Sequence, residues 1–272
     1  MRNAVLAASL VLGSAAAAWA DCDATAQRQA SLSLEGVTSV EIIAKAGSLK
    51  VYGRSGSNAI KAHGTACAST RSSLDDVTLR AEKRGNVARI EVDTPEIMMF
   101  WNEARLDLTV ELPDRLPIHI SDGSGSMDVE NVASVRIEDG SGDIDVQHVT
   151  GNVFIADGSG SIEVEDVGGD VKITDGSGEI VIDRVRGSVE IPADGSGSIE
   201  ISDVGGSVNI GTDGSGSIDI EKVRHDVTIG NDGSGSISVA DVTGDFTVRN
   251  DGSGGIHIER VTGHVSMPRE HD

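Results

Sequence analysis

The stretch of sequence that decides the fold is DGSGSIEVEDVGGDVKI, residues 157–173. Its apolar residues alternate with polar ones in two short runs, Ile162-Glu163-Val164 and Val171-Lys172-Ile173, and Val167 lies between them. Alternation with a period of two residues is typical of a half-buried β-strand. The stretch therefore predicts two short strands whose apolar edge must be buried against something else.

The tetrapeptide DGSG at the start of this stretch recurs through the second half of the chain at intervals of 17 to 19 residues. Self-similarity at a short period is the signature of repeat architectures. The expected fold is all-β: a parallel β-solenoid (a β-helix or β-roll) of eight coils of 17–19 residues, preceded by a β-rich N-terminal capping domain. The aspartates that open the eight coils are Asp122, Asp139, Asp157, Asp175, Asp194, Asp213, Asp232 and Asp251.

Stacking of the coils predicts five inward-facing columns of aliphatic side chains. The tetrapeptide and the VGG, VRG or VTG segment are expected to form the two corners of a coil, because glycine tolerates positive φ. In two neighbouring coils the expected stacked pairs are Ile162 with Ile180, Val164 with Ile182, Val167 with Val185, Val171 with Val189, and Ile173 with Ile191.

Two polar columns are also predicted. The DGSG aspartates either accept hydrogen bonds from the backbone N–H two residues on, as in Asx-turns, or form a stacked ladder that recruits cations. At another position the sign of the charge alternates from the third coil onward, which places opposite charges next to one another in a parallel stack. This second column comprises Asp166, Arg184, Asp203, Lys222, Asp241 and Arg260.

The N-terminus has the pattern of a secretory signal peptide, residues 1–20. Arg2 precedes a mostly apolar run that ends in Ala18-Trp19-Ala20, and cleavage is expected before Asp21. No later stretch has the ~20 apolar residues of a spanning helix, so no transmembrane segment is expected after cleavage. Asp21 and Trp19 also argue against a lipid anchor on Cys22. A periplasmic, secreted or cell-surface location follows.

Composition and pattern divide the remainder into a capping domain at residues 21–121, the solenoid at 122–267 and a C-terminal tail at 268–272. Strand-like runs in the capping domain cover residues 39–43, 48–52, 77–81, 88–92 and 106–112, with a hairpin turn at 83–86. One apolar segment either covers the first edge of the solenoid or forms a loop that contacts a partner or a membrane. Its residues are Met98, Met99, Phe100 and Trp101, preceded by Ile97.

Cys22 and Cys67 are the only cysteines. After export they meet an oxidising compartment, in which two thiols usually pair. A disulfide between them is expected, and it would add ~3 to 4 kcal/mol in the chain-entropy model. The alternative is a pair of unbonded, small core residues.

The outward positions on the first strand of each coil are mostly acidic, so one sheet presents a field of carboxylates. This face either keeps the protein soluble or serves as a docking surface for divalent cations, cationic peptides or a basic envelope protein. The candidate ligand residues are Asp128, Glu130, Asp145, Glu163, Glu165, Asp183, Glu200, Asp219, Glu221 and Glu259. The second strand is mixed and carries Arg136, Phe154, Lys172, Glu190, Asn209, Thr228, Thr247 and Ser266.

Several chemistries find no support in the sequence. A net charge of −22 argues against nucleic acid as a partner. The GSGS segments match neither a nucleophile elbow nor a phosphate loop, and calcium β-rolls require Asp where Ile162 stands. The seven histidines are scattered, so no catalytic residue, metal site or cofactor is expected.

Four segments carry a family resemblance: GSLKVYG at residues 47–53, GTACAS at 64–69, the DGSGSIEVEDV coils, and VTGHVSMP at 261–268. With these the chain resembles a bacterial family of exported, adhesin-like β-strand-repeat envelope proteins that is classed as a domain of unknown function. The resemblance implies an envelope location and a surface, stress or adhesion role. It implies no catalytic residues.

The function expected is a non-catalytic binding or structural module of the cell envelope, adhesin-like or related to envelope stress. A polysaccharide-active enzyme is one alternative, because β-solenoids host such enzymes, but coils this short do not readily build a catalytic groove. A surface protein that binds cations or cationic peptides is another. An ice or mineral binder would need a flat threonine array, whereas only Thr228 and Thr247 are expected to stack.

Overall fold

The structure, a computed structural model, describes residues 22–94 and 104–268. Three predicted segments lie outside the described residues and stay predictions: the signal peptide, the apolar segment at 97–101 and tail residues 269–272. Within the two described ranges, no helix is both long enough and apolar enough to cross a membrane.

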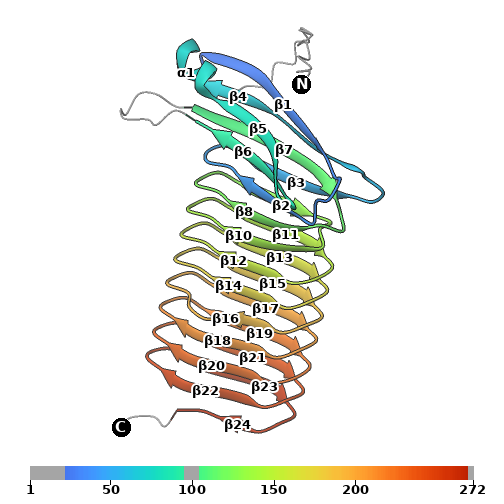
Figure 1. Cartoon of the computed structure of the whole chain (residues 1–272). Helices are drawn as coiled ribbons and strands as arrows, with labels where there is room; N and C mark the ends of the chain where they lie inside the picture. Colours follow the sequence, from blue (N-terminus) through green and yellow to red (C-terminus); the bar gives the residue numbers. More distant parts are fainter. Residues whose placement is uncertain (1–21, 95–103, 269–272) are drawn as a thin grey trace.

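Two sheets of twelve strands each build the protein, and every coil adds one strand to each sheet (Figure 1). Neighbouring repeat strands are parallel and in register, which confirms the predicted β-solenoid. In the repeats, sheet A contains β9 (Met127–Glu130), β11 (Ile144–Val149), β13 (Ile162–Val167), β15 (Ile180–Val185), β17 (Ile199–Val204), β19 (Ile218–Val223), β21 (Ile237–Val242) and β23 (Ile256–Val261). Sheet B contains β10 (Ser134–Glu138), β12 (Val153–Ala156), β14 (Val171–Thr174), β16 (Val189–Ile191), β18 (Val208–Asp213), β20 (Val227–Asp232), β22 (Phe246–Asp251) and β24 (Val265–Ser266).

The space between the sheets is filled by the predicted aliphatic columns. Ile162 pairs with Ile180, and Val171 pairs with Val189, as expected. All ten aliphatic residues assigned to these two coils are at most 1% exposed. Branched aliphatic side chains suit this geometry because they pack well on a pleated surface and stack on their equivalents ~4.8 Å away.

The N-terminal region continues both sheets rather than beginning new ones. Five of its strands are β2 (Ser39–Ile43), β3 (Leu49–Arg54), β6 (Val87–Asp93), β7 (Ala104–Pro113) and β8 (Pro117–Ser121). They extend sheet A in the order β7-β3-β9 and sheet B in the order β6-β2-β8-β10, all in parallel. Both sheets and the aliphatic core therefore run without a break past residue 121.

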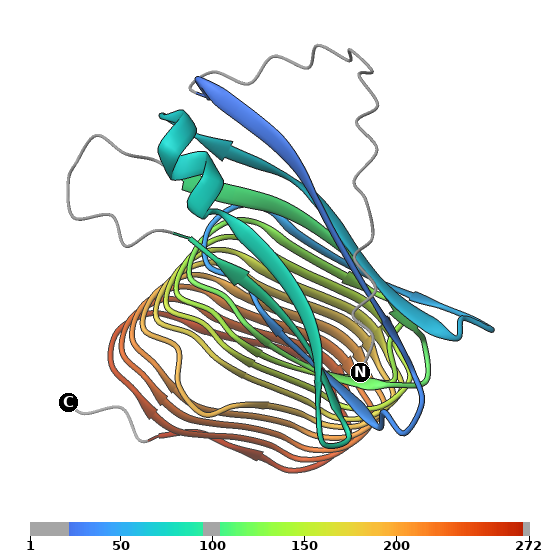
Figure 2. The ribbon, with the colours of Figure 1, turned by 45° about the horizontal axis from the view of Figure 1, so that its top comes forward.

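The first end of the solenoid is covered by antiparallel strands and a short helix. β1 (Ala24–Ser33) pairs with β4 (Ala59–Ala68) at the edge of sheet A, α1 (Arg71–Asp76) follows β4, and β5 (Thr78–Arg84) forms the edge of sheet B. Figure 2 shows these elements above the first coils. Arg28 on β1 donates hydrogen bonds of 2.8 Å to the carbonyls of Leu74 and Val77, which joins the two edges.

The sequence predicted part of this region. All five strand-like runs are strands, and β5 and β6 form the expected hairpin, with Arg84 opposite Val87 and Gly85 at φ 65°. β1, β4, β8 and α1 were not predicted. Two of the missed strands are long but contain polar residues and small alanines, which give a weak hydrophobic alternation.

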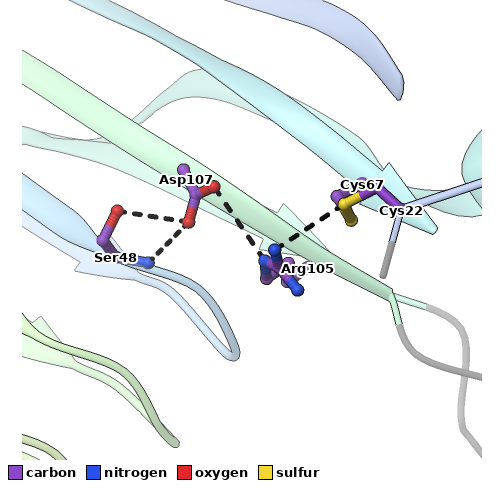
Figure 3. Close-up of a disulfide and its surroundings, with 5 residues drawn as sticks. All are labelled: Cys22, Ser48, Cys67, Arg105 and Asp107. Atoms are coloured by element: carbon purple, nitrogen blue, oxygen red, sulfur yellow. Dashed lines mark hydrogen bonds and ion pairs between the residues drawn. A yellow bond between two sulfur atoms is a disulfide. The ribbon is translucent and has the colours of Figure 1, made fainter. Parts of the chain in front are cut away.

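Cys22 and Cys67 form a disulfide, as expected, with their Cα atoms 5.5 Å apart (Figure 3). The bond joins the chain just before β1 to β4. Nearby, Arg105 on β7 contacts the Cys22 sulfur at 3.6 Å and Asp107 at 4.0 Å, and Asp107 accepts a hydrogen bond from the Ser48 N–H at 2.9 Å. Covalent and polar contacts thus link four neighbouring segments of the covered end.

The first corner of each coil depends on glycine, as predicted. The second glycine of every DGSG has a φ between 128° and 149°. A Cβ on Gly216 would lie 1.6 Å from the carbonyl oxygen of Gly197 in the preceding coil. Only glycine permits both this φ and this close approach.

The second corner was predicted incorrectly. Positive φ occurs there at the residue before the corner valine, with values from 51° to 59°, and not at the glycines that follow the valine. These glycines are required by close packing between coils; a Cβ on Gly205 would lie 2.4 Å from the Arg186 carbonyl oxygen. The residues with positive φ are Asn131, His148, Asp166, Arg184, Asp203, Lys222, Asp241 and Arg260.

Candidate functional site: the acidic face of sheet A

The ten predicted ligand carboxylates all lie on the outer face of sheet A, half-buried or exposed. The strand register arranges them in two columns. The first column contains Asp128, Asp145, Glu163, Glu200 and Asp219, with Val181 between Glu163 and Glu200. The second column contains Glu130, Glu165, Asp183, Glu221 and Glu259, with Gln147, Ser202 and Ala240 at the intervening positions.

Basic side chains from the second corner neutralise much of the second column. Arg184 contacts Glu165 at 2.8 Å and also pairs with Asp183. Lys222 lies 2.9 Å from Glu221. Arg260 lies 2.6 Å from Glu259. The hydrogen bond with His257, followed by the one from Arg260, holds the pKa of Glu259 below its usual range. Four of the five carboxylates of the second column therefore belong to ion pairs rather than to a free anionic surface.

Two of the same basic residues confirm the predicted charge ladder at two of its five steps. Arg184 bonds to Asp166 at 2.7 Å, and Arg260 bonds to Asp241 at 2.6 Å. These hydrogen bonds are the main cause of the lowered pKa values of both aspartates. In the coil before Asp166, the His148 side chain occupies the equivalent position, with its Nε2 atom 3.5 Å from the Asp166 carboxylate.

The first column is different, because fewer basic side chains neutralise its carboxylates, which stack on consecutive strands. Asp128 forms an ion pair with Lys50 at 3.5 Å and accepts a hydrogen bond from the Tyr52 hydroxyl at 3.3 Å. Burial raises the pKa of Asp145, whereas the hydrogen bond that it accepts from Gln147 lowers this pKa. The nearby carboxylates of Asp128 and Glu165 raise the pKa of Asp145 further. Burial, followed by the charges of Asp145 and Glu165, raises the pKa of Glu163 in the same way.

A shallow open groove of about 390 Å³ runs across this part of the first column. Five carboxylates line it: Asp128, Asp145 and Glu163 on the strands, and Asp143 and Glu179 just before β11 and β15. Its remaining wall includes Lys50 and the apolar side chain of Val181. The groove combines a concentrated negative charge with a small apolar surface, which suits an extended group that carries positive charge.

The groove does not have the donor set of a metal centre. Nowhere in residues 22–94 and 104–268 are three or more His, Cys, Asp or Glu side chains grouped so as to hold a metal ion. The side chains are instead spaced along neighbouring strands ~4.8 Å apart. The spacing of such a row matches a chain that carries several positive charges in succession.

Sheet B offers a less uniform surface. Its outward residues stack in the predicted register, from Arg136 on Phe154 through to Thr247 on Ser266. Lys172 pairs with Glu190 at 2.9 Å, and Phe154 is 39% exposed. Thr228 stacks on Thr247 as expected.

Sequence reasoning missed the burial of the eight DGSG aspartates, which we call the aspartate column. Six of them are buried, while Asp139 and Asp251 are half-buried. The Asx-turn expectation is correct only in part: the Asp122 carboxylate accepts a 2.8 Å hydrogen bond from the N–H of Gly123, the next residue, and Ser124 two residues on contributes more weakly. An aspartate is almost never fully buried unless it is paired. The residue type at these positions therefore did not predict that they lie in the core.

The comparisons with known proteins find solved structures that are distantly similar to this chain. No family model matches the chain, and no curated protein sequence matches it. A solved structure of a putative cell adhesion protein from Clostridium sporogenes is 12% identical and aligns over 91% of this chain and 100% of its own, with a TM-score of 0.39. A putative lipid binding protein from Parabacteroides distasonis is 14% identical over 89% of this chain and 97% of its own, with a TM-score of 0.44.

A putative adhesin from Parabacteroides merdae is 12% identical over 89% of this chain and 96% of its own, with a TM-score of 0.36. At these identities and scores, the similarities say nothing about function.

Proposed function

We propose that this protein is a non-catalytic binding module of the cell envelope, and that the first column of sheet A is its docking surface for a cationic peptide or a basic segment of another envelope protein. The observation that carries the proposal is the groove in which Asp128, Asp145 and Glu163 stack on consecutive strands. The second column cannot serve equally well, because Arg184, Lys222 and Arg260 already neutralise it.

The electrostatic argument supports a partner with several positive charges. Carboxylates ~4.8 Å apart along the stack lie well within the ~8 Å Debye length at physiological salt, so each repels its neighbours. A cationic side chain placed between two of them relieves that repulsion. An extended peptide with lysines or arginines meets one carboxylate of the row after another, which gives both affinity and a preferred direction.

The experiment measures binding of a fluorescent hexalysine peptide to the full chain by anisotropy at low and physiological salt. The double variant Asp145→Asn with Glu163→Gln should weaken binding by roughly tenfold, since it removes two adjacent groove charges. The matched control is Glu221→Gln with Glu259→Gln, which removes the same charge from the neutralised second column of the same face.

The control should change the affinity by less than about twofold, because its carboxylates are already engaged by Lys222 and Arg260. Equal losses in the two double variants would show that the peptide responds to net charge alone. In that case the acidic face acts only to keep the protein soluble.

A further inference from the structure

The aspartate column brings like charges together inside the molecule. Asp194, Asp213 and Asp232 pair in register along sheet B, so each carboxyl group lies directly above the next. Asp213 is 1% exposed, and Asp194 and Asp232 are each 4% exposed. A buried carboxylate has lost its hydration and requires a donor, a cation or a proton in its place.

The column lacks donors for many of these oxygens. Both carboxyl oxygens of Asp194, Asp213 and Asp232 are inaccessible to solvent and have no hydrogen-bond partner of normal geometry among the described residues. The backbone N–H groups of Gly195, Ser196 and Ser215 come close enough only to offset part of the rise in the pKa of Asp194 and Asp213. The further oxygens of this kind in the column belong to Asp122, Asp139, Asp157, Asp175 and Asp251. Unpaired oxygens on side chains that are more than nine-tenths buried indicate that a bound species is still to be accounted for.

Among the described residues, no basic side chain acts on Asp157, Asp213 or Asp232. The charged groups that act on Asp157, Asp213 and Asp232 are other members of the column. Five titratable residues stand on the segments that flank the column, and all five are exposed. They are Lys45 beside the first coil, Glu138 before Asp139, Asp143 and Glu179 after the DGSG turns, and Arg249 two residues before Asp251.

The neighbours within reach are the carboxyl groups themselves. The carboxyl of Asp213 lies within hydrogen-bond reach of Asp194 on one side and of Asp232 on the other, and Asp232 also reaches Asp251. Two carboxylates so close cannot both remain ionised at low cost, whereas a carboxylic acid donates its O–H to the carboxylate beside it. A proton shared between the carboxyl groups of two consecutive coils gives one of them an O–H that donates a hydrogen bond and the other an oxygen that accepts it. It also neutralises one of the two negative charges.

We propose that the aspartate column is a proton-binding site: as the pH falls from neutral into mild acid, it takes up protons that are shared between the carboxyl groups of consecutive coils, and the folded solenoid becomes more stable. The ligand is the proton, because each step of the stack offers two carboxyl groups. The described residues contain no group of three or more acidic, His or Cys side chains that could hold a metal ion.

The direction of the pH effect follows from proton linkage. Burial, reinforced for Asp157, Asp213 and Asp232 by neighbouring column charges, raises the pKa of Asp122, Asp157, Asp213 and Asp232 from 3.8 to about 6. The folded chain therefore binds these protons more tightly than the unfolded chain. Stability should rise as the pH falls through 6, and this gain is complete below the unfolded value near 4.

Other carboxyls set the acid limit of this effect. The ion-paired residues Glu91, Asp166, Asp241 and Glu259 have lowered pKa values, so their contribution is lost when the pH falls through those lowered values. The structure thus predicts greatest stability on the acid side of neutrality, at roughly pH 4 to 5.

The test follows thermal unfolding of the full chain, by circular dichroism, at pH 5 and pH 8 and fixed ionic strength. The parent should melt roughly 5 °C or more higher at pH 5. Asp213→Asn removes one buried charge and should raise the melting temperature at pH 8 while reducing the difference between the two pH values. Asp219→Asn makes the same charge change on the outer face of the next strand and should leave that difference intact.

Infrared spectroscopy of the folded parent at pH 5 reads the bound proton directly. A carboxylic-acid C=O stretch should be present and should weaken in Asp213→Asn; this measurement on the parent decides the matter even if the variant does not fold. Absence of the band, or an equal pH difference in the parent and both folded variants, overturns the proposal.

A further measurement distinguishes a bound proton from a bound metal ion. At pH 8 and matched ionic strength, each of sodium, potassium and calcium chloride should stabilise Asp213→Asn as much as it stabilises the parent. If one cation raises the melting temperature of the parent in a saturable manner and not that of Asp213→Asn, the column is a cation site and the proton proposal is wrong.

Discussion

The two corners of each coil treat the same residue type in opposite ways. At the first corner, aspartate stacks on aspartate within the interior, and burial raises the pKa of Asp213 and Asp232 to about 6. At the second corner, aspartate alternates with arginine or lysine on the surface, and Arg184 and Arg260 lower the pKa of Asp166 and Asp241. Both columns follow the same ~4.8 Å stacking.

The difference shows that an in-register repeat stacks equivalent residues on one another, so the interaction between two of them recurs along the whole column. A surface position repeats safely when its charge alternates, because each residue then stacks between opposite charges. A buried position that repeats one charge must change its protonation or bind a counter-ion. The repeat thus contains an acid-sensitive column and an acid-resistant one on the same scaffold.

The largest expected effect comes from placing a carboxylate where no carboxyl neighbour exists. Val204→Asp puts it in an aliphatic column, between Val185 and Val223. We expect a loss of roughly 3–5 kcal/mol in the free energy of unfolding, because an uncompensated charge is buried. Urea denaturation at pH 7.5 measures it.

The matched control for this variant is Glu200→Lys, which stands on the outer face of the same strand. It should change stability by less than about 0.5 kcal/mol. Equal losses in the two variants would mean that the strand is in the opposite register, with its alternate face inward.

A second prediction concerns the glycine on which the first corner depends. Gly216→Ala should destabilise the fold by roughly 2–4 kcal/mol, because φ is 147° and the new Cβ would meet the Gly197 carbonyl oxygen. Gly255→Ala is the control, since a Cβ there meets nothing within 4 Å. If both variants unfold at the same denaturant concentration, backbone approach between coils does not limit this corner.

A third prediction tests the alternation at the second corner. Arg184→Glu would stack three acidic residues in succession, with Asp166 below and Asp203 above, and should lower the melting temperature by roughly 1–3 °C at low salt. Arg184→Gln, which removes the charge without reversing it, should fall between this variant and the parent.

Because the second corner is exposed, 1 M sodium chloride should abolish most of the Arg184→Glu effect. A loss that persists in high salt would trace the effect to the backbone at the positive φ of residue 184 rather than to charge.

The smallest expected effect concerns the acidic face. Millimolar calcium or magnesium should raise the melting temperature by roughly 1–2 °C through mass action on the folded array, more than sodium chloride at matched ionic strength. The triple variant Glu163→Gln, Glu200→Gln and Asp219→Asn should not respond. A response equal to that of the parent would place the ions elsewhere.

The candidate site was predictable to different degrees in its parts. The positions of all ten outward carboxylates follow from alternation, because residues i and i+2 of a strand share a face. The neutralisation of the second column was not predicted: it depends on Arg184, Lys222 and Arg260 leaving the corner with positive φ and reaching back over sheet A. That backbone conformation is unusual for such residues and has no signature in the alternation.

The sequence by itself determined the solenoid, the inward aliphatic columns, the register and the charge ladder, since each is a regular function of the repeat and every coil repeats the same constraint. Only the tertiary structure decided that β2, β3, β6 and β7 extend both sheets beyond the repeats, and that the DGSG aspartates face the interior. Both outcomes depend on how the chain turns between strands. The direction of the side chain that follows a turn depends on several φ and ψ values at once. These values cannot be inferred from the periodicity of the strands.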